Sequence, residues 1–595
     1  MKSSKKFHFG VNTIFIVVTF IFIVIVCFVK SSAGAEYKIV ETKDGKVRGV
    51  RDTTLIKKVD FDSFKGIPYA ENPIGELRYK APEPVKSWAP IILNATEFGS
   101  TCTQISLLAP ENPLQQSENC LFLNVYVPAD IESDEKLAVL VYIHGGAFTE
   151  GSGNDDMFGP DFLIEQRVIL VTLNYRLGIF GFISFETPEY SGNMALKDQQ
   201  LALKWVQANI KQFSGDNKRI TLFGESAGGV LSHVQILSSE SRKYFRNAIL
   251  LSGTAESDWG FASKNGHRSI AHEIARDLGK PQDSMQSLIN FFKTVPAESI
   301  VKYASAASLF TKTPVTTWAP ILERGDAIHP FIVEYPKAIY NKSNIDVDTM
   351  FALCSLESMM LYNEKFEDCY DLKGFDRNFS ITFPFRGADL PFDSTEYKKL
   401  AAEVRYFYFK DAAIDVQTLK PYISLLSDVF FAYGVDKGAK LHAKKSAAKT
   451  FYYRFSVDSK FNAIKRWHGG GPGFAGAGHA DDLCYIFRCR NAQPFYDEAL
   501  STPDDEQSKI SLRAVENITK LFANFAKYGE PTYQQEPIAG FLPIDDDQVN
   551  FLDVTNDGLM PGVNPNQKAM EFWAHVEREV QEIQAKSKQF VHEEL

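Results

Sequence analysis

The chain has 595 residues, 45% of them apolar, and its formal net charge at pH 7 is −10. Such an acidic balance argues against nucleic acid as a partner, because phosphate contacts require clustered lysine and arginine. Seven cysteines are too few to build a fold from disulfides, while the apolar content is enough for the core of one large α/β unit.

The N-terminus has the pattern of a targeting segment. Lys2, Lys5 and Lys6 precede an apolar run over residues 14–29, and small residues at 32–35 offer a cleavage site. We therefore expect residues 1–35 to be a signal peptide and residues 36–595 to form a single domain. Cleavage would remove four lysines and no acid, so the net charge would pass from −10 to −14. The apolar run is long, and an uncleaved signal anchor facing the lumen is the alternative.

Residues 137–143 form a continuous apolar run with the length of a buried strand. The run ends in His144-Gly-Gly-Ala-Phe148, where Gly145, Gly146 and Ala147 leave the backbone open to close approach. A loop of this type supplies backbone N–H groups that stabilise an oxyanion during acyl transfer. We expect these three residues to lie at such a site.

The next strand contains the most informative motif. Residues 219–223 predict a buried strand and residues 227–237 predict a helix, with Gly224-Glu-Ser226-Ala-Gly228 between them. The pattern Gly-x-Ser-x-Gly in this setting forms a strained turn that exposes the serine hydroxyl. The flanking glycines avoid collisions with the neighbouring strand and helix. Ser226 is therefore the predicted nucleophile, and the N–H group of Ala227 is a further oxyanion donor.

A serine nucleophile on this kind of turn is followed in the chain by an acid and then by a histidine. Glu357 is the best candidate for the acid, because it follows a predicted strand over residues 349–354. Other carboxylates close to this strand stay open as alternatives, namely Glu364, Glu367, Asp346 and Asp348.

His479 is the predicted base. It lies in a glycine-rich segment just before an apolar run over residues 483–487, and catalytic groups favour loops on a rigid scaffold. Gly471-Pro-Gly473-Phe-Ala-Gly476 fits a dinucleotide-binding pattern, but no strand leads into it. We interpret that stretch as a mobile loop that carries His479.

Strand-like runs alternate along the chain with helical ones such as residues 201–210, and no repeat or linker interrupts them. This alternation predicts an α/β fold with a mostly parallel central sheet that is covered by helices on both faces.

Together these motifs resemble the type-B carboxylesterase and cholinesterase family of α/β-hydrolases, and insect alpha-type carboxylesterases in particular. The resemblance runs from about Val40 to about Trp573 and includes blocks at residues 64–78, 117–126, 174–178 and 192–198. It implies an α/β-hydrolase fold and a serine carboxylic-ester hydrolase that acts on a small-molecule ester. It implies no metal and no cofactor.

The resemblance assigns a role to each candidate. It makes Ser226 the nucleophile, Glu357 the acid and His479 the base, and it places Gly146, Ala147 and Ala227 at the oxyanion, with Gly145 beside them. The chain departs from the family pattern at Asn119, where an aspartate is usual, and at Ser358, where a glycine usually follows the acid. A second usual glycine, before the acid, is replaced by Ala352 or Leu353, so the register of the acid loop is open by a residue.

The resemblance also implies a disulfide between Cys102 and Cys120. The loop that this bond would close contains no aromatic residue, whereas cholinesterases place there a tryptophan that binds the choline cation. We therefore expect neutral esters to be preferred. Phe148 and Trp259 are predicted to line the substrate pocket, with core packing as the alternative for Trp259.

The remaining cysteines receive no partner from the resemblance. The spacing of Cys484 and Cys489, without histidine or a further cysteine nearby, argues against a zinc site. The pairing of these two, and of Cys354 and Cys369, stays open.

The chain ends in His592-Glu-Glu-Leu595, which resembles the tail that a KDEL-type retention receptor reads in the endoplasmic reticulum. A glycosylated luminal protein is also consistent with four sequons, at Asn94, Asn341, Asn378 and Asn517. We expect the endoplasmic reticulum lumen, with secretion as the alternative. Two other functions stay open: a catalytically silent adhesion or binding protein, which typically lacks triad residues, and a lipase-type esterase.

Overall fold

The computed structural model describes residues 36–105, 115–262, 264–280, 283–308, 318–361, 372–382, 394–467, 473–532, 541–545 and 548–593. The predicted signal segment, Cys369, two of the alternative acids (Glu364 and Glu367) and the last two residues of the tail lie outside this part of the chain. Within the described ranges, no helix combines the length and the apolar character that a membrane crossing requires.

The fold is organised around one large sheet. In the described part of the chain it has 13 strands, in the order β1-β2-β3-β7-β9-β8-β10-β11-β12-β13-β14-β15, with β4 beside β2. The strands of this sheet are β1 (Tyr37–Thr42), β2 (Gly45–Thr53), β3 (Asp60–Pro68), β4 (Ile92–Asn94), β7 (Phe122–Pro128), β8 (Leu137–Ile143), β9 (Ile169–Leu173), β10 (Gly215–Glu225), β11 (Asn247–Leu251), β12 (Asp348–Cys354), β13 (Thr450–Phe455), β14 (Asn550–Thr555) and β15 (Gly558–Val563). Two short strands, β5 (Thr101–Cys102) and β6 (Gln116–Ser117), pair separately.

The centre of the sheet is parallel and its margins are antiparallel. From β9 through β8, β10, β11, β12 and β13 to β14, each strand runs parallel to its neighbour. Antiparallel pairs flank this centre at β1–β2, β2–β3, β3–β7, β7–β9 and β14–β15. The mostly parallel α/β-hydrolase sheet predicted from the sequence is confirmed.

The sequence of strand β8 is apolar throughout because both faces of the strand are buried. Alternate side chains of a strand point to opposite faces, and both faces of this strand are covered. Val139, Val141 and Ile143 belong to one hydrophobic cluster, and Leu140 and Tyr142 belong to the other. Full burial of each such side chain contributes about 1.5–3 kcal/mol, so a polar face would be strongly disfavoured here.

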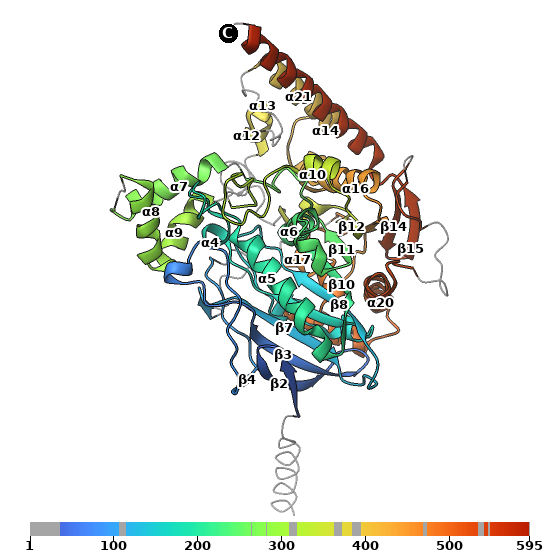
Figure 1. Ribbon diagram of the computed structural model, residues 1–595. Helices are drawn as coiled ribbons and strands as arrows, with labels where there is room; N and C mark the ends of the chain where they lie inside the picture. The colour runs from blue at the N-terminus through green and yellow to red at the C-terminus, as the bar shows by residue number, and fades with distance from the viewer. Residues whose placement is uncertain are drawn as a thin grey trace, which may run out of the picture.

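Helices cover both faces of the sheet (Figure 1). Helices α5, α6 and α16 contribute to the first cluster, whereas α3, α18, α19 and α20 contribute to the second. The α-helices are α2 (Asp155–Phe158), α3 (Asp161–Ile164), α4 (Gly178–Phe182), α5 (Met194–Asn209), α6 (Ala227–Leu237), α7 (Lys264–Asp277), α8 (Met285–Thr294), α9 (Ala297–Ser308), α10 (Pro336–Lys342), α12 (Leu372–Arg377), α13 (Phe379–Thr382), α14 (Thr395–Phe409), α15 (Leu419–Ser427), α16 (Tyr433–Lys445), α17 (Ala463–Trp467), α18 (Leu483–Ile486), α19 (Gln493–Ser501), α20 (Glu506–Tyr528) and α21 (Gln567–Glu593).

The termini of helix α20 follow from local sequence. The side chain of Asp505 accepts a hydrogen bond from the N–H group of Ser508 and so caps α20, and Gly529 ends it in the left-handed conformation. Helix α21 stacks Phe572 on Phe407 of α14 and then leaves the body of the protein (Figure 1).

The topology places the site at the carboxyl ends of the central strands. The chain passes from β8 to β9 on one side and later returns to β10 on the other side of β8. Ligands of open α/β sheets bind outside the carboxyl ends of the strands at such a reversal. The loops that follow β8, β10 and β12, which carry the predicted oxyanion residues, Ser226 and Glu357, all start at these carboxyl ends.

Candidate active site

Ser226 occupies a strained turn between β10 and α6. Its φ is 57° and its ψ is −121°, a backbone conformation that residues other than glycine rarely adopt. Its N–H group donates to Leu251 O at 2.8 Å. A Cβ atom at Gly224 would lie 2.3 Å from Gly228 O, and one at Gly228 would lie 2.0 Å from Ile143 O. Both flanking positions therefore require glycine, since the helix and strand β8 approach too closely for any side chain.

The loop after β8 lies directly against this turn. A Cβ atom at Gly145 would lie 3.1 Å from the Cβ atom of Ser226, and Gly146 and Ala147 have φ values of 102° and 51°. In the described part of the chain, the N–H groups of Gly146, Ala147 and Ala227 donate no hydrogen bond. The loop thus presents unused backbone donors beside the serine.

His144 holds this loop in place. Burial lowers the pKa of its imidazole to about 4, so the ring is neutral and its Nδ1 donates to Gly145 O at 2.8 Å. The ring stacks on Tyr175 with 4.4 Å between centroids, and the Tyr175 hydroxyl donates to His144 O at 2.7 Å. The histidine that opens the loop is therefore a fixed support rather than a titrating group near pH 7.

Glu357 and His479 meet although 122 residues separate them. His479 Nδ1 donates to Glu357 Oε2 at 2.6 Å, and the backbone N–H group of His479 donates to Glu357 O at 2.9 Å. The other carboxylate oxygen, Oε1, accepts from the Ser252 hydroxyl at 2.6 Å and from the Cys354 N–H group at 2.7 Å. The carboxylate is thus buried, and both of its oxygens accept hydrogen bonds.

Two of the alternative acids lie at the wrong end of β12. Asp348 is the first residue of this strand and accepts a hydrogen bond from the N–H group of Lys449, and Asp346 precedes it. Glu357 comes shortly after Cys354, the last residue of the strand, and so lies at the carboxyl ends of the strands together with Ser226. Of the described carboxylates considered for this role, Glu357 alone contacts His479.

A second carboxylate faces the same imidazole. Glu225 Oε1 lies 3.1 Å from His479 Nε2, but the two groups are not aligned as a hydrogen bond. Burial raises the pKa of Glu225 to about 7. Burial lowers the pKa of His479, but the charges of Glu225 and Glu357 outweigh this effect and raise it to about 9. The imidazolium form is therefore stabilised from both sides.

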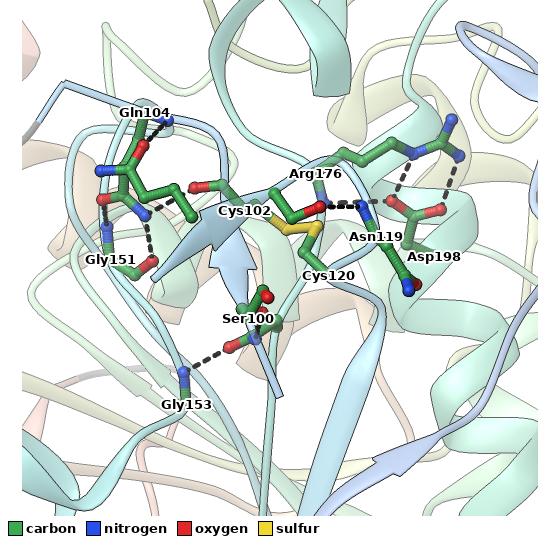
Figure 2. Close-up of a disulfide and its surroundings, with 12 residues drawn as sticks. Ser100, Cys102, Gln104, Asn119, Cys120, Gly151, Gly153, Arg176 and Asp198 are labelled. Atoms are coloured by element: carbon green, nitrogen blue, oxygen red, sulfur yellow. Dashed lines mark hydrogen bonds and ion pairs between the residues drawn. A yellow bond between two sulfur atoms is a disulfide. The ribbon is translucent and has the colours of Figure 1, made fainter. Parts of the chain in front are cut away.

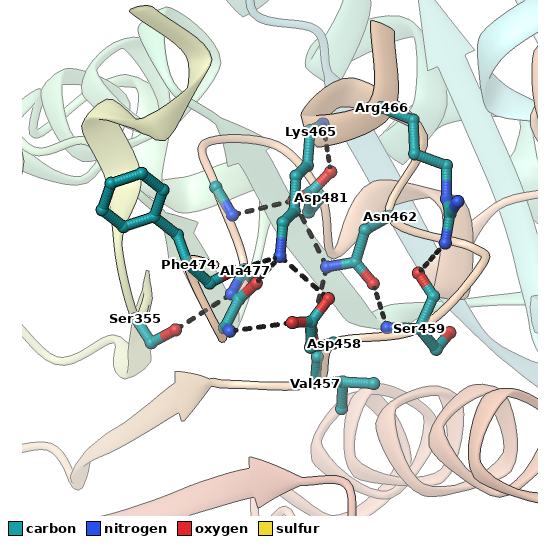
Figure 3. A network of polar contacts seen from close by, with 12 residues as sticks. Ser355, Val457, Asp458, Ser459, Asn462, Lys465, Arg466, Phe474, Ala477 and Asp481 are labelled. Carbon is teal, nitrogen blue, oxygen red and sulfur yellow. Dashed lines mark hydrogen bonds and ion pairs between the residues drawn. The ribbon is translucent and has the colours of Figure 1, made fainter. Parts of the chain in front are cut away.

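The segment that leads to His479 is held by a polar network (Figure 3). Lys465 Nζ donates to Asp458 at 2.9 Å, to Phe474 O at 2.7 Å and to Gly476 O at 3.1 Å. Asp481 accepts from the N–H groups of Lys465 and Gly478. The sequence predicts a mobile loop over residues 471–476. In the described residues 473–479, hydrogen bonds to a lysine and an aspartate hold the backbone, and the mobility of the loop stays a prediction.

Aromatic side chains form a wall beside these groups. Phe148 and Trp259 are both buried, with 6.0 Å between their ring centroids. Phe431 contacts Trp259 at 6.0 Å and the His479 ring at 4.5 Å. Trp259 also approaches the turn itself, since a Cβ atom at Gly253 would lie 3.1 Å from its ring and 2.2 Å from Ser226 O.

Cys102 and Cys120 are joined by a disulfide with an S–S distance of 1.98 Å (Figure 2). Gln104, two residues on, exchanges two hydrogen bonds with Gly151, at 2.7 and 2.9 Å. Because Gly151 follows the glycine loop after β8, the disulfide segment is tied to the rim of the site. Figure 2 also shows the buried ion pair of Arg176 and Asp198, which joins the sequence blocks at residues 174–178 and 192–198.

A second disulfide joins Cys484 and Cys489, shortly after His479. The sequence left this pair open, and Cys354 is a buried free thiol. Within the described ranges, no group of three or more histidine, cysteine, aspartate or glutamate side chains could hold a metal ion.

The four sequons differ in accessibility. Asn94, Asn341 and Asn378 are exposed, whereas Asn517 is half-buried within α20. The first three positions offer an attached glycan direct access to solvent.

Two residues at the site, Glu225 and Ser252, were not predicted from the sequence patterns. Glu225 stands at the variable position of Gly-x-Ser-x-Gly, where a carboxylate at the end of a strand whose last six residues are buried could have drawn notice. Ser252 has no local signal at all, because only its position after β11 brings it to Glu357.

Comparisons with known proteins find one family over most of the chain. A model described as the carboxylesterase family matches residues 36–573. Esterase B1 of Culex pipiens is 29% identical over 551 residues, which cover 90% of this chain and 97% of the relative. Juvenile hormone esterase of Heliothis virescens is 32% identical, covering 82% of this chain and 85% of the relative. Acetylcholinesterase 1 of Caenorhabditis briggsae is 29% identical, covering 86% and 83%.

A solved structure is similar over nearly the whole chain. It is juvenile hormone esterase from Manduca sexta with OTFP covalently attached, and the similarity has a TM-score of 0.78 at 26% identity. The match covers 91% of this chain and 99% of that one.

Proposed function

This chain belongs to the carboxylesterase family and hydrolyses carboxylic esters, and we propose that it does so through an acyl-enzyme formed on Ser226. The observation that carries the proposal is the Glu357–His479 hydrogen bond of 2.6 Å beside the strained serine turn. A nucleophile, a base and an orienting acid within one site is the arrangement that ester hydrolysis of this kind requires.

The proposed reaction has two halves. In its neutral form, which a pKa of about 9 makes the minor form at pH 7, His479 takes the proton from Ser226 Oγ on Nε2 while the oxygen attacks the ester carbonyl. The oxyanion is stabilised by the N–H groups of Gly146, Ala147 and Ala227, and each such donor contributes roughly 2.7–4 kcal/mol. Gly145 lies beside them and leaves room for the substrate to approach the backbone. When the tetrahedral intermediate collapses, the C–O bond to the alcohol breaks and the alcohol leaves with the proton from His479.

In the second half, His479 takes a proton from water, and the resulting hydroxide attacks the acyl-enzyme. The Ser226 ester bond breaks, the serine recovers its proton from His479, and the carboxylic acid leaves. Glu357 keeps the proton of the neutral imidazole on Nδ1 and stabilises the imidazolium. All atoms of ester and water are recovered in acid and alcohol, and every step uses side chains and backbone of this chain.

The nucleophile can be tested with one pair of variants. We expect Ser226→Ala to lower ester turnover by about a million-fold and to abolish labelling by a fluorophosphonate probe. Ser232→Ala is the matched control, because Ser232 is a buried serine on the same helix α6. Labelling that persists in Ser226→Ala would refute the assignment.

We further propose that the substrates are uncharged esters of short to medium chain length. The disulfide loop from Cys102 to Cys120 has no aromatic residue to hold a quaternary ammonium ion, and the wall of Phe148, Trp259 and Phe431 is apolar. The assay is kcat/KM for butyrylthiocholine against a neutral butyrate thioester of similar leaving-group reactivity. A preference for the cation would refute the proposal, and a preference for long-chain emulsified esters would indicate a lipase instead.

A luminal location is the corresponding proposal for the cell. It is supported by the signal-like segment 1–35, the tail His592–Leu595 and the exposed sequons. Deleting the four tail residues should send glycosylated, active enzyme into the medium, because a retention receptor reads the tail and the tail is not itself an anchor. Efficient secretion of the full chain would refute retention, and a truncated protein that stays with membranes would indicate an uncleaved anchor.

A further inference from the structure

One helix next to the site changes its winding where it passes the acid–base pair. Helices α15 and α16 are joined without a break by a π-helical turn, η6 (Asp428–Ala432). Here the N–H group of Tyr433 donates to Asp428 O, five residues back instead of four. Single π turns inside helices are uncommon and often occur at functional sites. The proposed mechanism uses no group from this turn.

The residue before the turn holds the segment that carries Glu357. The hydroxyl of Ser427 accepts a hydrogen bond from the N–H group of Ser358 at 2.9 Å and donates to Ile423 O at 2.8 Å. Ser358 directly follows Glu357, and all of these groups are buried. The backbone on the far side of the acid is thus fixed by a single side chain of α15.

Four residues further on, the turn contacts the base. The ring of Phe431 lies 4.5 Å from the imidazole of His479 at an interplanar angle of 39°. The contacts of Ser427 with Ser358 and of Phe431 with His479 show that both side chains lie on the side of the helix that faces the acid and the base. The carbonyl of Phe430 accepts the indole N–H of Trp259 at 2.6 Å, which ties the same turn to the aromatic wall.

The helix is itself anchored to the loop that follows β11. A Cβ atom at Gly434 would lie 2.6 Å from the Cα atom of Ser257, and one at Gly438 would lie 3.0 Å from the hydroxyl of Thr254. The Thr254 hydroxyl donates to Gly434 O at 2.8 Å. This loop begins at Ser252, which donates to Glu357. Because contacts this close leave no room to slide, the turn has a fixed position relative to the acid.

We propose that the end of α15 and the π-helical turn after it form a positioning element for the acid–base pair, in which Ser427 fixes the backbone at Glu357 and Phe431 fixes the plane of the His479 ring. The inference rests on the proposed roles of Glu357 and His479. Neither Ser427 nor Phe431 reacts; each acts through the group that it holds. A misplacement of about 1 Å in such a pair can cost on the order of a hundredfold in rate.

The test compares Ser427→Thr with Ser427→Val. Both substitutions add the same volume at a buried site, but only threonine keeps the hydroxyl that accepts from Ser358. We expect kcat for a small neutral ester to be ten- to a hundredfold lower in the valine variant than in the threonine variant, with KM within about twofold. Equal kcat values in two folded variants would overturn the role of Ser427.

The pH profile separates positioning from loss of stability. Since contact with Glu357 helps to raise the pKa of His479, a loosened pair should move the acid limb of kcat/KM to lower pH in Ser427→Val. A change that only reduced the amount of folded enzyme would scale the whole profile without moving the limb. An unmoved limb therefore counts against the proposal.

Phe431→Leu tests the other half and does not depend on the Ser427 variants folding. Phe430→Leu is its matched control, because Phe430 lies on the same turn but is more exposed. We expect Phe431→Leu alone to lower kcat by about tenfold, and by the same factor for acetate, butyrate and octanoate esters. A loss that varies steeply with acyl length would instead mean that Phe431 only contacts substrate, and equal kcat values in the two variants would overturn its role.

Ser226→Ala distinguishes failure of this inference from failure of the proposed function. If Ser226→Ala retains turnover, the serine mechanism itself is wrong. If Ser226→Ala is inactive while the threonine and valine variants at 427 are equal, the mechanism stands and the positioning role of the turn is refuted.

Discussion

Glu357→Gln should inactivate the enzyme because the structure dictates how the new amide must point. Oε1 accepts from the Cys354 backbone N–H group, which can only donate, and from the Ser252 hydroxyl, which can rotate. The glutamine oxygen must therefore occupy this position, and its NH2 group must face His479 Nδ1. An NH2 group cannot accept, so the imidazole is forced to carry its proton on Nε2, where it can no longer take one from Ser226.

The expected cost is about 10⁴ in kcat, by analogy with the asparagine substitution in other serine triads, and corresponds to about 5.5 kcal/mol of activation free energy. The fold should survive, because two of the three side-chain hydrogen bonds of Glu357 remain. The assay is steady-state hydrolysis of a neutral butyrate ester, with the thermal unfolding midpoint measured in parallel.

Two comparisons sharpen this test. Glu225→Gln removes a charge on the other side of the same ring without touching Nδ1, so it should lower the pKa of His479 but leave the tautomer correct. The reasoning is refuted if Glu357→Gln is folded and keeps more than about a tenth of the wild-type kcat, against the 10⁴ loss expected from a wrong tautomer. If Glu364→Gln is the damaging change instead, the acid has been placed in the wrong register.

Three further outcomes are expected. Ser252→Ala removes one hydrogen bond to the Glu357 carboxylate, worth about 1.5–3 kcal/mol, and should lower kcat ten- to a hundredfold with KM unchanged; an unaltered kcat would contradict its role. Gly228→Ala places a Cβ atom 2.0 Å from Ile143 O and should destabilise the fold by about 3 kcal/mol in urea unfolding, whereas Gly325→Ala, with nothing within 4 Å, should not. Burial lowers the pKa of His233 to about 3 and of His442 to about 4, so the unfolded chain binds more protons below about pH 6.5. Stability should therefore fall as pH drops from about 6.5 towards 4, and a double His→Gln variant that keeps the same slope would contradict this.

Sequence patterns predicted those features that depend on neighbours in the chain. The apolar run of β8 agrees residue for residue with the strand, and helix α6 begins and ends where its sequence predicts. The two glycines around Ser226 are explained by main-chain contacts within 2.3 Å, which a strand–turn–helix motif already implies. These features are local because backbone conformation and side-chain periodicity are set within a few residues.

Long-range pairing was decided only by the tertiary structure. The sequence favours Glu357 over Asp348 only because Glu357 follows the predicted strand and Asp348 precedes it. The direction of β12 supports this choice, because it brings one end of the strand to the serine and the other to Lys449. The Cys484–Cys489 bond was also found only in the structure, although its partners are close in the chain, because spacing alone could not assign them.

The positions of Ser252, Ser427 and Phe431 depend still more on packing. Each belongs to a different element, and each contacts the acid or the base only because the loop after β11 and the α15–α16 helix pack against the carboxyl ends of the parallel strands. The sequence alone predicted the strands and helices of the scaffold and the proposed nucleophile, since both depend on short-range patterns of size and polarity. The tertiary structure decided which buried polar groups surround them, because a buried carboxylate must find its hydrogen-bond partners among whichever residues the fold brings within reach.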